Sequence, residues 1–367
     1  MKTISVETLR MWLEEGRPVT ILDVRPADQR ADWAIPGSVH IDAYRALNEH
    51  DPHALDSVEV ASDAPVVTVC AAGRTSQLAA EQLAARSVPA LSLEGGMKAW
   101  SLAWNTAEVP LLGSQARVIQ VRRTGKGCLS YLIGAGEEAF VIDASLDPQI
   151  YLDLARSRGW QITSVFDTHI HADHLSRSRQ LAERSRAMLF LPDQKRVSFP
   201  YTSMRDGDTL ATEHLTLTAV HTPGHTPEST CYLLNNALLF TGDTLFPTGI
   251  GRPDLHADEQ EARARSVLLY HSLHKLLALP SETLVLPGHA SRPVPFDGKP
   301  VGARLAEIDE QVGLLHATQT AFVETLLRLL PPTPPNYERI VTLNEAGLLP
   351  DHDVTELEAG ANRCAIS

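Results

Sequence analysis

The chain has 367 residues, of which 43% are hydrophobic, and carries a formal net charge of -13 at pH 7. This length accommodates two domains of ordinary size, each with its own buried core. The charge is negative in the first 110 residues and in the remainder, which argues against a nucleic-acid partner because phosphate contact needs clustered Lys and Arg.

Targeting signals and a disulfide framework are not recognisable in the sequence. No apolar run approaches the length that spans a bilayer, and the N-terminus has no signal-peptide pattern. The four cysteines, Cys70, Cys128, Cys231 and Cys364, are scattered without a regular spacing. We therefore expect a soluble cytoplasmic protein with no membrane partner, and interpret the last three cysteines as structural.

Short apolar runs alternate with helical patterns in about the first hundred residues. Residues 19–24 and 64–70 predict buried strands, and a helix is expected at about 76–85. Two glycines at 95 and 96 precede a short helix that ends near residue 100. Strand, turn and helix in repetition predict a parallel α/β sheet for a first domain at 1–108.

A second series of elements follows residues 102–113, which lack clear periodicity. We place the linker at 109–115, a second domain at 116–300 and its helical C-terminal extension at 301–367. The expected strands lie at 117–121, 128–133, 139–143 and 162–167, with helices at 151–159 and 337–344. The apolar segment 326–330 fits either the core or a subunit interface, so a homo-oligomer is left open.

One cysteine stands between a predicted strand and a predicted helix. Cys70 is followed by the loop Ala71, Ala72, Gly73, Arg74, Thr75 and Ser76. Backbone N–H groups at a helix N-terminus stabilise a thiolate and can hold a transferred anionic sulfur. Gly73 permits a tight turn. The same pattern also fits a buried structural cysteine at the end of a strand.

Three further segments carry a family resemblance. Residues 22–25 (Leu-Asp-Val-Arg), 35–41 (Ile-Pro-Gly-Ser-Val-His-Ile) and 93–100 (Leu-Glu-Gly-Gly-Met-Lys-Ala-Trp) resemble the rhodanese family in order and spacing. The resemblance implies that Cys70 is catalytic and carries a persulfide, with residues 71–76 as the persulfide loop. Many relatives have Arg where Thr75 stands, and Ala71 and Ala72 replace polar residues that select the sulfur donor. A sulfur-binding domain without transferase activity is the alternative.

Metal-binding residue types cluster in the second domain. Asp167-Thr168-His169-Ile170-His171-Ala172-Asp173-His174 follows a predicted strand and holds three imidazoles and a carboxylate within six positions. Such groups suit Zn, Fe or Mn better than a hydrophobic core. Later strand ends add His225, Asp243 and His289. Because strand ends meet at one edge of a sheet, these side chains are expected to converge on one metal site.

This set resembles the metallo-β-lactamase superfamily from about residue 118 to 289, which implies an αββα sandwich. In the glyoxalase II branch, His169, His171 and His225 would hold one metal, Asp173, His174 and His289 a second, and Asp243 would bridge them. In the persulfide dioxygenase branch, a single Fe(II) would be held by His169, His225 and Asp243. The remaining residues of the set would then lie beside the metal rather than bind it. Two histidines and one carboxylate leave positions open for O2 and substrate.

The dioxygenase interpretation is preferred. Gly251-Arg252-Pro253-Asp254 resembles a signature of that branch, which implies that Arg252 anchors substrate or the geometry around iron, against an ordinary surface arginine. The implied reaction converts glutathione persulfide, O2 and water to glutathione and sulfite, using one Fe(II) per chain. The rhodanese domain would exchange sulfane sulfur between persulfide, sulfite and thiosulfate. The alternative is a thioester hydrolase of the glyoxalase II type with two Zn.

Two departures from the dioxygenase branch affect the expected substrate. Arg177 stands where relatives usually have Gly, and residues 291–300 replace an Asn-Pro-Arg-Leu segment expected after the last histidine. The second of these segments is expected to border the pocket. The thiol that carries the persulfide is therefore not defined by the sequence, and coenzyme A or another low-molecular-weight thiol could replace glutathione.

Overall fold

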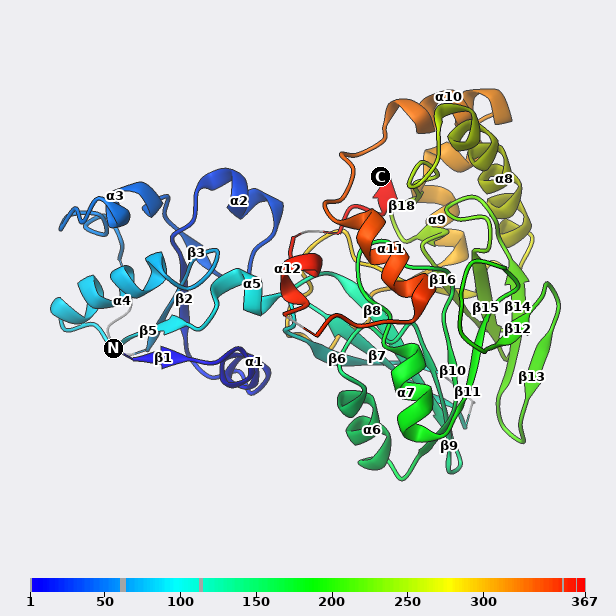
Figure 1. Cartoon of the computed structure of the whole chain (residues 1–367), viewed down its shortest axis with the longest axis horizontal. Coiled ribbons are helices and arrows are strands. Elements are labelled where there is room, and N and C mark those ends of the chain that lie inside the picture. Colours follow the sequence, from blue (N-terminus) through cyan, green and yellow to red (C-terminus); the bar gives the residue numbers. More distant parts are fainter. Residues whose placement is uncertain (1, 60–63, 112–114, 352, 361, 367) are drawn as a thin grey trace.

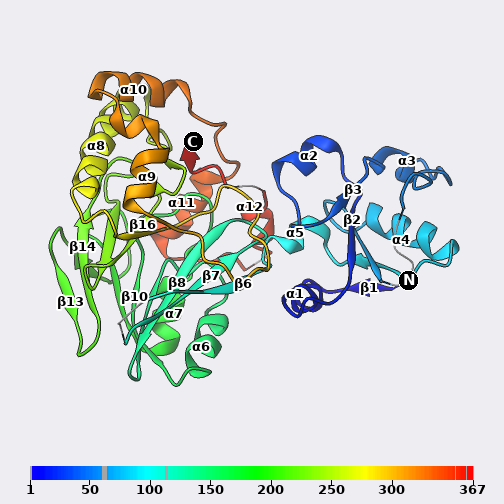
Figure 2. The ribbon, with the colours of Figure 1, turned by 180° about the vertical axis from the view of Figure 1, so that it is seen from behind.

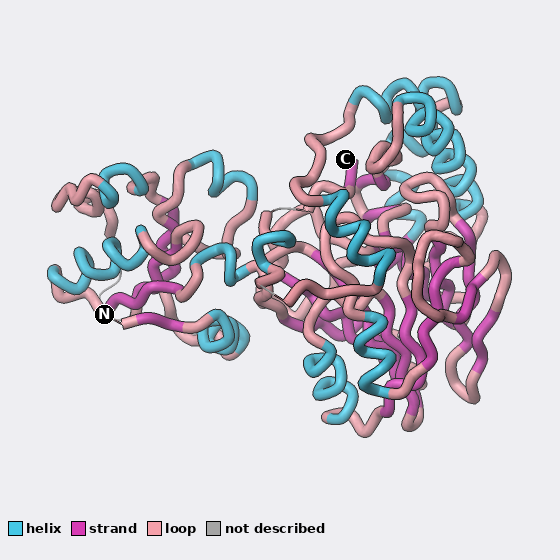
Figure 3. Tube along the Cα trace, viewed as in Figure 1, coloured by secondary structure: helices cyan, strands magenta, loops and turns pink. Residues whose placement is uncertain are grey.

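The computed structural model describes residues 2–59, 64–111, 115–351, 353–360 and 362–366. Two domains lie side by side along the long axis of the molecule, as Figures 1 and 2 show from opposite sides. Within the described residues, no helix combines the length and apolar character that crossing a membrane requires. In both domains the strands lie between or beside helices (Figure 3).

The N-terminal domain is built on a five-stranded sheet with the order β1-β5-β4-β2-β3, and every pairing in it is parallel. Its strands are β1 (Thr3–Ile4), β2 (Thr20–Asp23), β3 (Val39–His40), β4 (Val66–Val69) and β5 (Ala90–Leu93). Its helices are α1 (Val6–Glu14), α2 (Ala27–Asp32), α3 (Tyr44–Asn48), α4 (Thr75–Ala85) and α5 (Gly96–Trp100). The predicted parallel α/β sheet is confirmed, and the carboxyl ends of its strands share one edge.

The C-terminal domain contains two large sheets. The first has the order β12-β11-β10-β9-β8-β7-β6, and the second β13-β14-β15-β16-β19-β20. The first is formed by β6 (Asn105–Val109), β7 (Arg117–Arg123), β8 (Cys128–Ala135), β9 (Glu138–Ile142), β10 (Gln161–Phe166), β11 (Met188–Pro192) and β12 (Thr202–Met204). The second is formed by β13 (Thr209–Ala211), β14 (Thr216–His221), β15 (Thr230–Leu234), β16 (Leu238–Gly242), β19 (Leu284–Pro287) and β20 (Ala303–Arg304).

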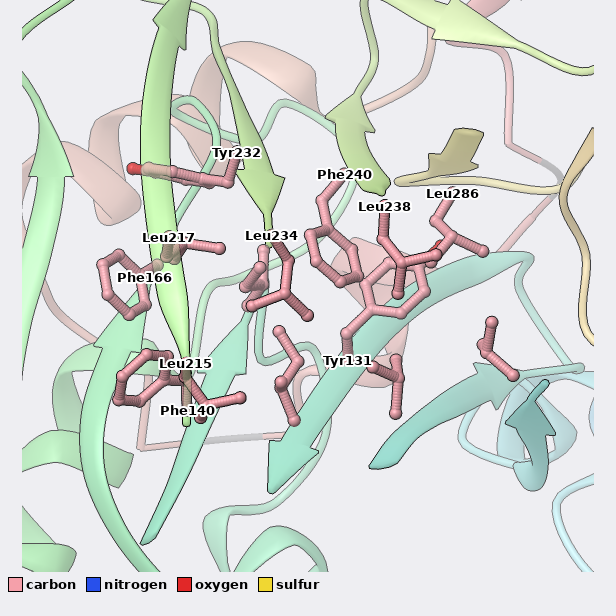
Figure 4. Close-up of a cluster of buried hydrophobic side chains, with 14 of the residues drawn as sticks. Tyr131, Phe140, Phe166, Leu215, Leu217, Tyr232, Leu234, Leu238, Phe240 and Leu286 are labelled. Carbon is pink, nitrogen blue, oxygen red and sulfur yellow. The ribbon is translucent and has the colours of Figure 1, made fainter. Parts of the chain in front are cut away.

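Aromatic and aliphatic side chains fill the space between these two sheets (Figure 4). Phe166 of the first sheet stacks on Phe190 with ring centroids 4.7 Å apart and meets Tyr232 of the second sheet edge-on at 5.3 Å. Helices α6 (Pro148–Arg156) and α7 (Ser178–Ser185) pack on the outer face of the first sheet, and α8 (Glu259–Leu277) on that of the second. The expected αββα sandwich is confirmed.

The strand β6 differs from the expectation for the domain boundary. It lies within the range expected for the N-terminal domain, yet it pairs antiparallel with β7 along the edge of the C-terminal sheet. Its side chains alternate between buried and partly exposed over only five residues, too short a run to show as periodicity. The buried Asn105 Oδ1 accepts a hydrogen bond of 2.7 Å from Arg122 Nε, which fixes the register.

The C-terminal extension is helical, as expected, and returns to the junction between the domains. It contains α9 (Leu305–Gln311), a 3-10 helix (Gly313–His316), α10 (Gln319–Arg328), α11 (Tyr337–Ala346) and α12 (Thr355–Glu358). Its last strand, β21 (Ala365–Ile366), joins β17 (Leu245–Phe246) and β18 (Gly249–Gly251) in a three-stranded sheet. In the apolar segment 326–330, Leu326 is buried in the core, whereas Leu329 is 48% exposed.

Three side-chain contacts are among those that join the two domains. Trp33 Nε1 donates to the carbonyl of Thr124 over 3.1 Å. Lys98 of α5 forms an ion pair of 2.7 Å with Glu356 of α12, which lies beside α5 where the domains meet (Figure 1). Arg363 pairs with Asp32 of α2 at 3.2 Å. Two of the three contacts come from the last residues of the chain, so the C-terminal extension holds the domains together.

A buried carboxylate of this extension supports the loop that carries the metal-type motif. Glu358 is fully buried and accepts hydrogen bonds from Arg123 Nη2 at 2.7 Å, Arg177 Nη1 at 3.0 Å and the Leu175 amide at 2.8 Å. Burial opposes its ionisation, but Arg123 and Arg177 outweigh burial and lower the pKa of Glu358 from 4.5 to about 2. Arg177, one of the two departures noted in the sequence, thus forms part of this buried ion cluster through its contact with Glu358.

Glu358→Gln should destabilise the C-terminal domain by about 3 to 5 kcal/mol at pH 7, because it leaves two buried guanidinium groups without a counter-charge. A carboxyl whose pKa is lowered on folding stabilises the fold above its unfolded pKa and loses that effect as the pH falls. The difference in the free energy of unfolding between wild type and Glu358→Gln should therefore become smaller as the pH falls from about 4.5 to 2. Urea unfolding of both proteins across this pH range tests the prediction. Equal urea midpoints of wild type and variant at pH 7 would contradict it.

Candidate metal centre

Loops from both sheets bring all seven motif residues into one buried region. His169, His171, Asp173 and His174 follow β10, while His225, Asp243 and His289 follow β14, β16 and β19. Each of the seven residues is at most 3% exposed. The region lies where strand ends of the two sheets meet, so residues far apart in sequence become neighbours.

Within this region, His169, His225 and Asp243 form one close group, with a ligand atom from each lying within 4.8 Å of the others. Asp243 Oδ2 lies 3.8 Å from Nε2 of His169 and 3.6 Å from Nε2 of His225. The group consists of two imidazoles and one carboxylate, which is the donor set of a facial site with open positions.

The other atoms of these three side chains are held by hydrogen bonds. His225 Nδ1 donates to the carbonyl of Arg252 over 2.7 Å, and His169 Nδ1 to the Thr168 hydroxyl over 2.9 Å. His289 Nδ1 donates to Asp243 Oδ1 over 2.5 Å. These contacts leave Nε2 of both histidines and Oδ2 of Asp243 directed toward one another, as ligands of a shared ion must be.

Electrostatics keep the three groups in the protonation states that metal binding needs. Burial lowers the pKa of His169 and of His225, so both rings stay neutral. Burial opposes ionisation of Asp243, but the neighbouring His289 outweighs it and lowers the pKa of that carboxyl. Asp243 is therefore an anion between two neutral imidazoles.

His171 stands apart from this group. Its Nε2 lies 3.2 Å from Oδ1 of Asp143, and the two residues group with Asp167. Asp143 has a positive φ of 54°, uncommon for a residue other than glycine, and also accepts from the Thr168 hydroxyl at 2.9 Å. Sequence reasoning missed Asp143, although it ends a predicted strand at the same edge as the motif.

The remaining motif residues form a second group with a cysteine. Cys128, Asp173, His174 and His289 each place a ligand atom within 4.8 Å of the others. Cys128 Sγ lies 3.5 Å from Asp173 Oδ2, and His289 Nε2 lies 3.0 Å from the same oxygen. Cys364 also lies in this region, grouped with Asp243 and His289. The interpretation of Cys128 and Cys364 as merely structural therefore overlooked their place at the centre.

The region fits a metal ion. Three buried atoms of the motif residues have no hydrogen-bond partner among the described residues: Asp243 Oδ2, His171 Nδ1 and His174 Nε2. Buried polar atoms without partners are costly and rare, and a bound cation would satisfy them. The imidazole, carboxylate and thiol donors suit zinc or iron.

Arg252 holds the C-terminal segment next to this centre. It is 1% exposed, and its guanidinium donates to both carboxylate oxygens of Asp254 and to the carbonyls of Pro331, Pro332 and Arg363. These contacts use all five guanidinium N–H groups, which leaves none for a substrate. The structure thus departs from the expected substrate contact. Arg252 instead contributes to the centre through its backbone carbonyl, which accepts the hydrogen bond from His225 Nδ1.

Asn344 of α11 ties the extension to the motif loop. Its Nδ2 donates to the carbonyls of His171 and His174 at 2.8 and 2.9 Å, and its Oδ1 accepts from the Ser176 amide at 2.8 Å. The loop is thereby fixed by a residue about 170 positions away. A role for Asn344 could not be read from the sequence motif itself.

Two sizeable cavities border the centre, beside a small one of about 30 Å³ that His169 and His171 line. One of about 260 Å³ is lined by His225, Leu255 and Arg265 among others. The other, of about 660 Å³, is lined by His289, by Phe246 and by residues 291–295 of the segment that stands where the Asn-Pro-Arg-Leu sequence was expected. That segment borders a pocket, as the sequence suggested.

The loop that follows Cys70, expected from the sequence to hold a persulfide, lies at the carboxyl edge of the N-terminal sheet. Cys70 follows β4 and is 2% exposed, and its Sγ accepts from the Gly73 amide at 3.1 Å and from the Ser76 hydroxyl at 3.3 Å. Gly73 has a φ of 88°, which favours glycine. Thr75 turns away and donates to Asn48. The sulfur thus accepts two hydrogen bonds near the start of α4, one from a backbone amide and one from a hydroxyl.

The other loop residues lie around this sulfur. Ala71, Ala72 and Arg74 are exposed. Ala72 also lines a cavity of about 790 Å³ between the domains, together with Lys98 and Arg177. The loop therefore opens toward the space between the two domains.

Comparisons with known proteins agree with this two-part architecture. Residues 5–103 match the rhodanese-like domain, and residues 123–289 match the metallo-β-lactamase superfamily. A hydroxyacylglutathione hydrolase of Rhizobium johnstonii is 38% identical over 151 residues, 40% of this chain and 56% of that protein. One from Brucella ovis is 31% identical over 155 residues, 41% of this chain and 54% of that protein. The chain thus spans about half the length of these curated relatives.

Solved structures of the same fold include two with substantial overlap. A metallo-β-lactamase from Staphylococcus aureus has a TM-score of 0.58 and 26% identity, covering 64% of this chain and 74% of that one. ETHE1 from Myxococcus xanthus has a TM-score of 0.55 and 31% identity, covering 62% of this chain and 97% of that one. The chain is therefore a rhodanese-like domain followed by a metal-binding domain of the metallo-β-lactamase superfamily.

Proposed function

We propose that this protein is a persulfide dioxygenase, with one Fe(II) held by His169, His225 and Asp243. Its substrate would be glutathione persulfide or a related low-molecular-weight persulfide. The supporting observation is that His169, His225 and Asp243 group together without His171, which is hydrogen-bonded to Asp143 instead. Two histidines and one carboxylate are the ligands of many non-heme Fe(II) oxygenases.

The proposed reaction balances as R–S–SH plus O2 and H2O giving R–SH and SO3²⁻ with two protons. When bound, Fe(II) supplies the redox chemistry by which O2 oxidises the sulfane sulfur. The protein contributes ligand orientation through Thr168, Arg252 and His289, as their hydrogen bonds to the three ligands indicate. The deep burial of those ligands limits access of bulk water to the reacting atoms.

The N-terminal domain would carry sulfane sulfur on Cys70. A persulfide on this residue could pass its outer sulfur to sulfite and so form thiosulfate, or receive sulfur in the reverse direction. The Gly73 amide and the Ser76 hydroxyl, both within 3.3 Å of Sγ, support such a role because they would stabilise an anionic sulfur. Both domains would then act on the same class of sulfur compound.

A second candidate is a thioester hydrolase with two zinc ions. It is favoured by His171 Nδ1 and His174 Nε2, which have no hydrogen-bond partner among the described residues and could serve as further ligands. The name hydroxyacylglutathione hydrolase, borne by the curated relatives, points the same way. In this alternative a metal-activated water would attack the thioester carbonyl.

His171→Ala separates the two candidates. If one Fe(II) is held by the proposed group, the variant keeps about one iron per chain and loses no more than about 10- to 100-fold in O2 uptake with glutathione persulfide, as for an outer-shell change. Elemental analysis and an oxygen electrode, applied to protein purified without air, measure both. Two zinc ions in the wild type, hydrolysis of S-lactoylglutathione without O2, and metal loss in the variant would establish the hydrolase instead.

A further inference from the structure

The last described residues of the chain lie against the metal centre. β21 pairs antiparallel with β18, so that Ile366 stands opposite Ile250 and Ala365 opposite Gly251. β18 begins only a few residues after Asp243. Cys364 immediately precedes β21 and is 1% exposed. The C-terminal tail thus brings a thiol into the buried region that holds the motif residues.

The Cys364 sulfur lies at ligand distance from two motif residues. Its Sγ, an oxygen of Asp243 and a ring nitrogen of His289 are all within 4.8 Å of one another. Independently of the cysteine, Asp243 Oδ2 lacks a hydrogen-bond partner among the described residues, although it is buried. Unpartnered atoms of this kind indicate that a cation belongs beside them. Thiolate, imidazole and carboxylate together are a common ligand combination for first-row metals.

Hydrogen bonds fix the tail on both sides of this cysteine. The Arg252 amide donates to the Cys364 carbonyl over 3.1 Å, and the Arg252 guanidinium donates to the carbonyl of Arg363 over 3.2 Å. Asn362 Nδ2 donates to Asp173 Oδ2 over 3.0 Å, and Asn362 Oδ1 accepts from the Cys364 amide over 2.9 Å. The sulfur is therefore held at the centre by a network that includes two motif residues, Asp173 and Arg252.

The neighbouring residue links the same tail to the other domain. Arg363 pairs with Asp32 of α2 at 3.2 Å. Cys364 therefore stands on a segment that is attached to the metal centre on one side and to the rhodanese-like domain on the other. A purely structural cysteine, such as Cys231 between the strands and helices of the second sheet, needs no such attachments.

We propose that Cys364 is a ligand of the metal centre, where its thiolate binds an ion beside Asp243 and His289. Binding converts the thiol to a thiolate and releases the proton to solvent, with no change in oxidation state. The C-terminal tail then closes one side of the centre. This inference requires that the centre binds a metal, and it adds a thiolate to the ligands named above for either of the two functions.

Cobalt substitution of the full-length protein tests this assignment. Co(II) bound to thiolate gives an intense near-ultraviolet charge-transfer absorption that nitrogen and oxygen ligands do not give. The band is expected in wild type and in the matched control Cys231→Ser, and its loss is expected in Cys364→Ser. Competition with a chromophoric chelator should show that Cys364→Ser binds Zn(II) about 10- to 100-fold more weakly, as for other changes around a metal site.

The outcomes separate the thiolate assignment from the metal centre itself. Wild type that binds Co(II) by equilibrium dialysis but shows no thiolate band would overturn the proposal, as would a full band in Cys364→Ser. Wild type that binds no Co(II) and no Zn(II) would overturn the metal centre and the proposed function with it. Far-ultraviolet circular dichroism reports whether Cys364→Ser is folded.

Discussion

Asp243→Asn is expected to abolish iron binding and to lower O2 uptake with glutathione persulfide by more than about a hundredfold, since even outer-shell changes cost 10- to 100-fold. Asp243 supplies the only carboxylate of the proposed iron site, with Oδ2 at 3.6 Å from His225 Nε2. Asn has nearly the same shape but no charge. It leaves two neutral imidazoles, which hold Fe(II) weakly without an anionic partner.

The measurement combines iron content per chain with oxygen-electrode rates. Asp153→Asn, which alters an exposed carboxylate on α6, is the matched control and should retain both properties. Sulfur transfer by the N-terminal domain should be unchanged in Asp243→Asn, because Cys70 belongs to a separate sheet and core. Full iron content and normal O2 uptake in this variant would exclude the proposed site.

Cys70→Ser is expected to reduce thiosulfate:cyanide sulfur transfer by more than about a thousandfold, as expected when a nucleophile is removed. The Ser hydroxyl can occupy the same position beside the Gly73 amide but cannot form a persulfide. The fold should survive, because the substitution removes little volume and keeps a polar atom at the site.

Cys231→Ser, a buried cysteine in the other domain, provides the comparison for this second result. Cys70→Ser should still take up O2 with added glutathione persulfide, because that reaction needs only the metal centre. If sulfur transfer instead remained at a background level equal in wild type and Cys70→Ser, the N-terminal domain would be a sulfur-binding module without catalytic function.

Several features followed from the sequence because they depend on local order. Alternating strands and helices define the parallel sheet of the first domain, and the loop after β4 brings Gly73 and Ser76 to Cys70. Residues that follow buried strands share an edge of a sheet, so His169, Asp243 and His289 could be expected to converge. Residue type and position relative to a strand end were sufficient for these predictions.

The direction of each side chain depended on partners from elsewhere in the chain. His169 and His171 are two positions apart, and spacing alone treats them alike. Asp143, from a neighbouring strand, binds His171 Nε2 and places it outside the group of His169, His225 and Asp243. Likewise, the guanidinium of Arg252 donates all its N–H groups to Asp254 and to three backbone carbonyls. It therefore has no N–H group left for the direct substrate contact that was one of the two roles expected from its motif.

The sequence by itself thus determined the two domain types, the sulfur-bearing loop and the set of residues at the metal centre. The tertiary structure alone decided which motif residues group together, that β6 belongs to the second domain, and that Cys128 and Cys364 stand beside His289. The physical reason is that local sequence fixes strands and turns through nearest neighbours. Contacts between atoms hundreds of residues apart arise only when two sheets and a C-terminal tail pack together.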